Sequence, residues 1–409
     1  MREPSPNNFI DPSVKKCYII KPMQVGLGFS SRQDYIKAAK EAANNAMASL
    51  DSDKADLALV FTTKEFNHSL VLKEISAALA NTSLLGLSSS DLICSQGVLS
   101  NGIIIACFSF PEEIYFNTTC VEGITERNAL SLGEKLGEEL LYGCKGNRRN
   151  LSLIFSNCRS TEGQNIFLGL QRKVGKSFPM VGASVETEIY SGSAALNNAA
   201  CGVLFGGKLT FGMGTKHGWK PLGKPRKVTL SSGNAVIEID GKPAASLYKE
   251  YFDKDAAGIK KDLSRISAYY PIGINISGQK EYLLRSLYSI EENGALVFNG
   301  DVPKGSDVRL MISSKEACLE SGRQAAELAR DSLKGQKIKF VLIFNSSARS
   351  ALLGREASKE IEAVKDACGW DIPVAGVYTC AEQAPLNSAN YLGRPYFYNN
   401  SITVLTIAG

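Results

Sequence analysis

The chain has 409 residues, a formal net charge of +5, and apolar residues at 44% of its positions. This length is enough for two or three domains with buried cores, and the composition is that of a globular protein. Basic residues are not concentrated in blocks, because doublets such as Arg148-Arg149 and Lys260-Lys261 stand alone. A surface built to bind nucleic acid is therefore not expected.

The N-terminal stretch MREPSPNNFIDPSVKK has no apolar run of the kind found in secretory signals. The strongest apolar segment, residues 102–110, is too short to span a bilayer. The ten cysteines form no C-x-x-C pair, so we expect reduced thiols in a cytoplasmic protein that does not insert into membranes. Cys158 and Cys380 fall in predicted loops and are the two thiols to test for reactivity.

The first half of the chain contains two copies of one sequence pattern. The first copy has a predicted helix over 34–50, the strands DLALVFTT from Asp56 and SLLGLSSSD from Ser83, and a closing strand from Asn101. The second copy has a predicted helix over 128–141, the strands NLSLIFSNCRS from Asn150 and FPMVGASVE from Phe178, and a closing strand from Asn198. In both copies an amphipathic stretch separates the first two strands, which predicts a second helix there.

A segment of different character follows. Residues 225–245, PRKVTLSSGNAVIEIDGKPAA, alternate polar and apolar side chains around two turn sequences and predict a hairpin. The helix-like ASLYKEYF comes next, and residues 281–311 are typical of further antiparallel strands. A third copy of the pattern then has a helix over 315–333, the strands KFVLIFNSSARS from Lys339 and IPVAGVYTCAE from Ile372, and a closing strand from Asn400.

Continuous apolar strands separated by helices favour sheets covered on both faces, with parallel crossovers inside each copy. We therefore predict an α/β fold of repeated strand-helix-strand units. These units form mixed β-sheets flanked by helices, in two similar domains with an inserted antiparallel hairpin region. The Gly- and Pro-rich segment 217–225 is the expected boundary. It divides the chain into a tail over 1–22, an N-terminal domain over 23–219 and a C-terminal domain over 220–409.

Ligands of open α/β sheets bind beyond the carboxyl ends of strands, where helix N-termini offer free N–H groups. Each copy places a cation just past its first strand, namely Lys64, Arg159 or Arg349. Glu382 follows the second strand of the third copy. Arg349 and Glu382 are thus candidates to hold the carboxylate and the ammonium of one zwitterion, or to pair with each other. Further ligand-binding candidates in equivalent loops or nearby strands are Ser88, Ser89, Ser184, Arg285 and Tyr378.

Several stretches, taken in order, resemble the FIST family. They are GLGFSS, DLALVFTT, LLGLSSSD, GWKPLGKPRKVTLSSGNAVIEIDGKPA, YLLRSL, GALVFNGDVPKGSDVRLM and AGVYTCAEQAPL, within residues 23–409. The resemblance implies paired FIST N-terminal and C-terminal domains that sense small ligands, amino acids among them. It also implies a signalling partner such as a kinase or a chemoreceptor system. We therefore expect a stand-alone sensor that binds a small polar ligand in a cleft between its two domains.

No enzyme pattern is complete in this sequence. Ser246 and Lys249 fit S-x-x-K, but the accompanying S-D-N and K-T-G are absent, as are a Walker loop and a dinucleotide fingerprint. We expect no enzymatic activity, no metal and no cofactor. Two alternatives stay open. Some FIST proteins resemble haem-based nitric-oxide sensors, so this chain could be a haem protein with His68 or His217 as the axial ligand. The second alternative is an interaction scaffold without a ligand.

Overall fold

The computed structural model describes residues 22–144, 148–157, 160–254, 256–278, 281–385 and 393–409. Its first unit contains β1 (Gln24–Ser30), α1 (Tyr35–Ser49), β2 (Leu57–Thr63), α2 (His68–Ala78), β3 (Ser83–Ser89), β4 (Leu92–Cys94), β5 (Gly97–Leu99) and β6 (Ile103–Ser109). Its second unit contains β7 (Ile114–Glu122), α3 (Ala129–Tyr142), β8 (Arg149–Asn157), α4 (Ser160–Val174), β9 (Met180–Val185), β10 (Ile189–Ser191), β11 (Ala194–Leu196) and β12 (Ala199–Gly207).

The third unit is interrupted after its first strand. It consists of β13 (Thr210–Lys216) and then α8 (Lys315–Asp331), β22 (Ile338–Ser346), α9 (Ser347–Leu353), a 3-10 turn (Gly354–Glu356), α10 (Ala357–Cys368), β23 (Val374–Thr379), β24 (Ala381–Pro385), β25 (Pro395–Tyr398) and β26 (Ile402–Ala408). The three predicted repeats and their leading helices α1, α3 and α8 are thus present. Asp34 and Ser314 cap α1 and α8 by accepting backbone N–H groups, which explains where these helices begin.

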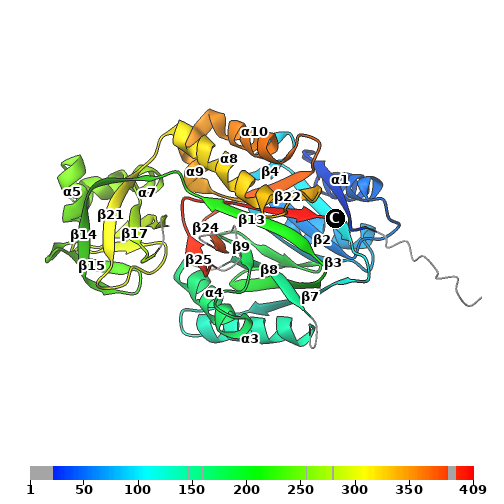
Figure 1. Ribbon diagram of the computed structural model, residues 1–409, viewed down its shortest axis with the longest axis horizontal. Coiled ribbons are helices and arrows are strands. Elements are labelled where there is room, and N and C mark those ends of the chain that lie inside the picture. The colour runs from blue at the N-terminus through cyan, green and yellow to red at the C-terminus, as the bar shows by residue number, and fades with distance from the viewer. Residues whose placement is uncertain (1–21, 145–147, 158–159, 255, 279–280, 386–392) are drawn as a thin grey trace, which may run out of the picture.

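Each unit builds most of one six-stranded sheet, in the orders β1-β6-β2-β3-β10-β11, β7-β12-β8-β9-β24-β25 and β13-β26-β22-β23-β4-β5. The two predicted crossover strands of each unit pair in parallel, as in β2 with β3. The last two strands of every sheet are a hairpin from another unit. The hairpins β10–β11, β24–β25 and β4–β5 complete the first, second and third sheets. This cyclic exchange joins the three units into one main body (Figure 1).

The inner faces of the three sheets share one apolar core. Phe61, Phe155 and Phe344 occupy the same position in the three repeats, and their rings meet edge to face at centroid distances of 6.1 and 5.9 Å. Alternate residues of the same strands, such as Val60, face outward and pack under α1 and α2. Each of the three repeats therefore contributes strands to the same central core.

A glycine stands at the equivalent position in the second crossover strand of each unit. A Cβ atom added to Gly86 would lie 1.8 Å from the carbonyl oxygen of Val60 on the neighbouring strand. The corresponding distances for Gly182 and Gly376 are 2.1 and 2.3 Å. The repeated glycine is therefore required by the close approach of the paired backbones rather than by turn geometry.

Residues 220–312 leave the main body and form the antiparallel domain (Figure 1). Its elements are β14 (Lys220–Ser232), β15 (Ala235–Ile239), β16 (Lys242–Pro243), α5 (Ser246–Phe252), α6 (Ala256–Lys261), α7 (Leu263–Tyr269), β17 (Ile272–Asn275), β18 (Tyr282–Arg285), β19 (Leu287–Ile290), β20 (Leu296–Phe298) and β21 (Asp307–Ile312). The chain leaves the main body next to the predicted boundary and returns to it at α8. Within the described ranges, no helix has the length and apolar run that crossing a bilayer would take.

Candidate functional site

A cavity of about 770 Å³ lies between the main body and the antiparallel domain. On the main-body side, its walls are the carboxyl ends of β8 and β9, the first turn of α4, and the exchanged hairpin β24–β25. On the other side, its walls are the turn before β15 together with β19 and β20. The location agrees with the rule that ligands of α/β sheets bind beyond the carboxyl ends of strands.

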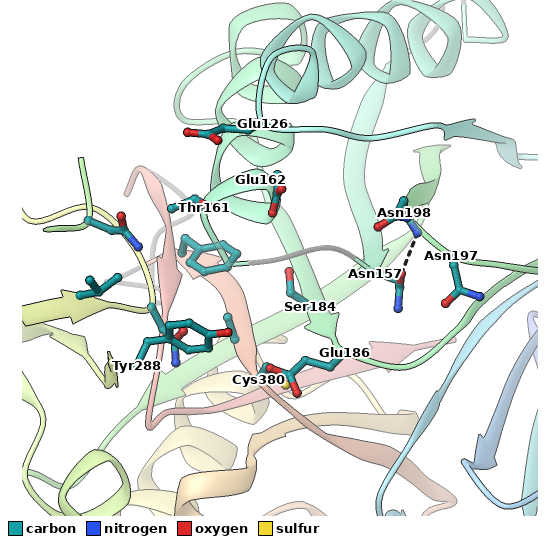
Figure 2. Close-up of a pocket in the computed structure, with 15 residues that line it drawn as sticks. Glu126, Asn157, Thr161, Glu162, Ser184, Glu186, Asn197, Asn198, Tyr288 and Cys380 are labelled. Carbon is teal, nitrogen blue, oxygen red and sulfur yellow. Dashed lines mark hydrogen bonds between the residues drawn. The ribbon is translucent and has the colours of Figure 1, made fainter. Parts of the chain in front are cut away.

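Three carboxylates line this cavity, from Glu126, Glu162 and Glu186 (Figure 2). None of the three forms an ion pair with any residue that the structure describes. The Oε2 atom of Glu162 is buried and has no hydrogen-bond partner within the described part of the chain. The described lining contains no Lys or Arg side chain, so its fixed charge is negative.

The remaining lining is polar, with two aromatic rings. Asn157 accepts a hydrogen bond from the backbone N–H of Asn198 at 2.8 Å and donates its amide to the carbonyl of Thr187, which holds the loop after β9 (Figure 2). Tyr288 is 55% exposed and extends into the cavity from β19, and Phe397 of β25 forms part of the wall. Amides, hydroxyls and aromatic faces thus surround the carboxylates.

Ser184, predicted from the sequence, does line the cavity. Its hydroxyl lies 2.6 Å from that of Ser156 and accepts a hydrogen bond from Gln383 at 2.8 Å. Cys380, which we singled out as a thiol to test for reactivity, also lines the cavity, and the residue is exposed although the surrounding protein crowds its thiol. Burial by the surrounding protein, with the Glu186 carboxylate, raises the pKa of the Cys380 thiol to about 12. The protonated thiol is a weak nucleophile at neutral pH.

Arg349 does not line this cavity and is fully buried in the main body. Its guanidinium pairs with Glu360, which is also 0% exposed, and donates to the carbonyl of Cys318 at 2.8 Å and the hydroxyl of Ser321 at 3.0 Å. Another N–H donates to the carbonyl of His217. The expected ligand role of Arg349 is therefore corrected to a structural one. On its helix, α9, Arg349 shares the buried face with Leu352 and Leu353.

Glu382 is also fully buried, and its partners are hydroxyl and backbone donors. Thr379 donates to one carboxylate oxygen, and Ser401 donates its hydroxyl at 2.7 Å and its backbone N–H at 3.2 Å to the other. Burial raises the pKa of Glu382 to about 7, against the lowering effect of these donors and of nearby Arg349. Glu382 and Arg349 therefore lie in one buried polar region without flanking a common crevice, and the pair cannot clasp a zwitterion.

The other predicted residues that the structure describes are not part of the cavity lining. Ser88 donates to the carbonyl of Glu188, and Ser89 donates to the carbonyl of Tyr378, so both hydroxyls bind backbone. The Tyr378 side chain is buried under the third sheet. Arg285 is 3% exposed and lies behind the cavity wall. Arg159 lies outside the described residues.

The two histidines do not fit a haem iron. His68 places Nδ1 against Glu188 and Nε2 3.1 Å from the carbonyl oxygen of Thr63. In His217, Nδ1 accepts the backbone N–H of Trp219 at 2.9 Å and Nε2 lies 3.1 Å from a Glu281 oxygen. An axial ligand needs an imidazole nitrogen directed at open space, whereas the two rings are buried, with His68 8% and His217 5% exposed. Across the described ranges, no group of three or more His, Cys, Asp or Glu side chains is arranged to hold a metal.

Sequence reasoning missed the three cavity glutamates and Tyr288. Glu186 ends the second copy of the repeated strand, and Glu162 lies in the first turn of the helix that follows NLSLIFSNCRS. A comparison of all acidic residues at these loop positions would have found both. Glu126 and Tyr288 carried no such signal, because they come from segments that only the tertiary structure brings to the cavity.

Comparisons with known proteins give relatives of unknown function. The chain is 27% identical to an uncharacterized protein of Methanocaldococcus jannaschii over 68% of its own length and 55% of the relative's, so it spans about half of that relative. It is 23% identical to an uncharacterized protein of Mycobacterium tuberculosis over 90% of its own length and 97% of the relative's.

Two solved structures of cyanuric acid hydrolase, one from A. caulinodans, align with 94% and 95% of the chain and with 99% and 100% of their own chains. The identities are 7% and 6%, and the TM-scores are 0.39 and 0.38. Since these aligned structures are enzymes, our expectation of a protein without enzymatic activity is corrected and not kept. TM-scores this low assign neither a reaction nor a substrate to this chain.

Two family models match most of the chain. The FIST N domain matches residues 56–242 and the FIST C domain matches residues 244–385. FIST domains are sensory domains of signal transduction that bind small ligands. The predicted resemblance is confirmed: this chain belongs to the FIST family.

Proposed function

We propose that this protein is a sensory module that binds a small polar ligand carrying an ammonium or guanidinium group, with amino acids and polyamines as candidates. The site is the cavity between the main body and the antiparallel domain. The observation that carries the proposal is the set of three carboxylates, Glu126, Glu162 and Glu186, in a cavity of about 770 Å³, none of them paired with a cation that the structure describes. Such a volume is in the range that holds small-molecule ligands.

The charge of the lining supports a cationic group on the ligand. An ammonium group donates up to three hydrogen bonds, and its positive charge would balance the negative charge of the carboxylates. It would therefore give the buried Oε2 of Glu162 a hydrogen-bond donor. Tyr288 and Phe397 add aromatic faces, and a cation beside such a ring gains further attraction. The asparagines supply donors and acceptors for the neutral part of the ligand.

The position of the cavity supports a mechanism of signalling. Its walls belong to two bodies, so a bound ligand contacts both at once and favours the arrangement in which both sets of contacts form. Occupancy would then shift the antiparallel domain relative to the main body. A signalling protein, such as a kinase or a chemoreceptor, would read that shift on the outer surface.

Isothermal calorimetry tests the proposal, with L-arginine, L-lysine and spermidine as cationic probes and succinate as an anionic probe. We expect the cationic probes to bind and Glu162→Gln to weaken them more than tenfold, because a hydrogen bond to a charged group contributes about 1.5–3 kcal/mol. Glu112→Gln is the matched control, because Glu112 is an exposed glutamate outside the cavity.

A cavity-filling variant, Ser184→Trp, separates binding in the cavity from binding elsewhere. Ser184 lines the cavity, and an indole there would occupy the ligand's space. If the cationic probes bind equally well to the wild type and to both cavity variants, or if none of them binds, the proposal is refuted. Binding of succinate alone would contradict the assignment of a cationic ligand.

A further inference from the structure

Arg285 lies at the junction of the two bodies, and its charge is not neutralised by an ion pair with any described residue. The residue ends β18 of the antiparallel domain and is 3% exposed. Burial lowers the pKa of its guanidinium to about 10. A buried cation without a carboxylate partner is costly unless its N–H groups are well bound. The acceptors of those N–H groups therefore decide how the buried charge is stabilised.

The guanidinium of Arg285 binds backbone carbonyls on both sides of the junction. Within the antiparallel domain, Nε donates to the carbonyl of Asp301 at 3.1 Å and Nη1 to that of Leu284 at 2.9 Å. Across the junction, Nη1 donates to the carbonyl of Phe397 at 2.8 Å. Phe397 belongs to β25 and forms part of the cavity wall. Arg285 therefore holds that wall from behind.

The same point of the antiparallel domain is also bound to α4. The backbone N–H of Asp301 donates to the side-chain oxygen of Gln164 at 2.8 Å. Gln164 is 8% exposed and lies two residues after Glu162, which lines the cavity. The first turns of α4 are thus tied to the loop that follows β20.

Gly300 allows these two side chains to meet. Its φ of +122° lies in the region that favours glycine. A Cβ atom there would lie 2.8 Å from Nε of Arg285 and 2.9 Å from the side-chain oxygen of Gln164. Any side chain at this position would push the two groups apart.

We propose that Arg285, Gly300 and Gln164 form a latch that sets the spacing of the cavity walls. The latch joins three elements that each contribute lining residues: α4, β25 and the loop after β20. Its members are positioning residues, since none of the three lines the cavity. The inference rests on the proposed function in that the cavity is the ligand site. It adds how the spacing of the cavity walls is held and how occupancy reaches the antiparallel domain.

Cys380 provides a test that needs no ligand, because its thiol lines the cavity. The rate of its alkylation by N-ethylmaleimide at pH 9 is measured by mass spectrometry on the full-length protein. Cys368 is a matched internal control: burial raises the pKa of its thiol to about 12 as well, and it ends α10, outside the cavity lining. The ratio of the two rates reports on the cavity walls rather than on overall stability.

In Arg285→Gln, we expect the ratio of the Cys380 rate to the Cys368 rate to rise about tenfold, because looser walls would crowd the Cys380 thiol less; a tenfold change corresponds to about 1.4 kcal/mol. Gln164→Leu removes only the acceptor for Asp301 and is expected to raise the ratio as well. Arg285→Lys retains a charged donor and should restore part of the protection. Circular dichroism confirms that each variant is folded.

An unchanged ratio in both Arg285→Gln and Gln164→Leu would overturn the latch, and so would an equal rise at both cysteines. This result is distinguishable from failure of the proposed function. If the cationic probes bind in the cavity but the ratio does not change, the latch alone is wrong. If the ratio rises as expected but no probe binds, the latch stands and the ligand assignment is wrong.

Discussion

Glu382 is expected to make the stability of this protein depend on pH between about 4.5 and 7. Its carboxyl is fully buried, and burial raises its pKa from 4.5 to about 7. A raised folded-state pKa means that the folded protein holds the proton more tightly than the unfolded chain does. This contribution to stability is therefore complete below pH 4.5 and is lost as the pH rises through 7.

The size of the effect follows from the two pKa values. The difference of about 2.5 pH units, at 1.36 kcal/mol per unit, corresponds to about 3 kcal/mol. Glu382→Gln has the shape of the protonated carboxyl and does not ionise. Its amide can donate to Thr379 while its carbonyl accepts from Ser401, the residues that now bind the carboxyl. The variant should resemble the wild type at pH 4.5 and be more stable by about 3 kcal/mol at pH 8.

Urea unfolding of both proteins between pH 4.5 and 8 measures this difference. Other groups titrate in the same range, but they are common to both proteins and cancel when the variant is compared with the wild type. A free-energy difference that stays constant across this range would show that folding does not raise the pKa of Glu382. The reasoning from burial would then be refuted.

Three further predictions concern the core and the cavity. Glu360→Gln leaves the buried Arg349 without its counter-charge and should lower the free energy of unfolding, measured with urea, by about 3–5 kcal/mol. A loss under about 1 kcal/mol would contradict the pairing. Gly86→Ala puts a Cβ atom 1.8 Å from the Val60 carbonyl oxygen and should lower the free energy of unfolding by about 1–3 kcal/mol, measured as a decrease in Tm. An unchanged Tm would show that the two strands can move apart at no cost. Arg159 comes between two cavity-lining positions in the chain. Arg159→Ala should therefore weaken the affinity for L-arginine, measured by calorimetry, and leave the affinity for spermidine unchanged, because spermidine lacks a carboxylate. Equal losses of affinity would exclude a role of Arg159 in binding a carboxylate.

The repeat was the most informative feature of the sequence. Apolar runs such as LALVF, LSLIF and VLIF mark strands buried on both faces, and each recurs with a helix before it and a second strand after it. These are local patterns, because periodicity and capping depend on neighbours in the chain. They predicted α1, α3 and α8 and the parallel pairs of strands. They carried no information on the exchange of hairpins, because that pairing joins residues far apart in the chain, such as Ala381 and Ser184.

The same division explains the outcome for the site. The rule for carboxyl ends of strands led to Ser184, which lines the cavity. It also led to Arg349, whose position in the sequence matches that of a ligand-binding residue but whose helix turns into the core to meet Glu360. Sequence spacing places a residue at the end of a strand. It does not determine which way the following loop turns, because that depends on what packs above it.

The family and the three repeated units could be predicted from the sequence alone, because both depend on the order of residues along the chain. The closed ring of three sheets, the cavity glutamates and the latch at Arg285 arise only when distant segments pack together. The lining of this cavity comes from both bodies, from Glu126 in the main body to Tyr288 in the antiparallel domain. Such convergence is a property of packing, and packing acts between residues that the sequence keeps far apart.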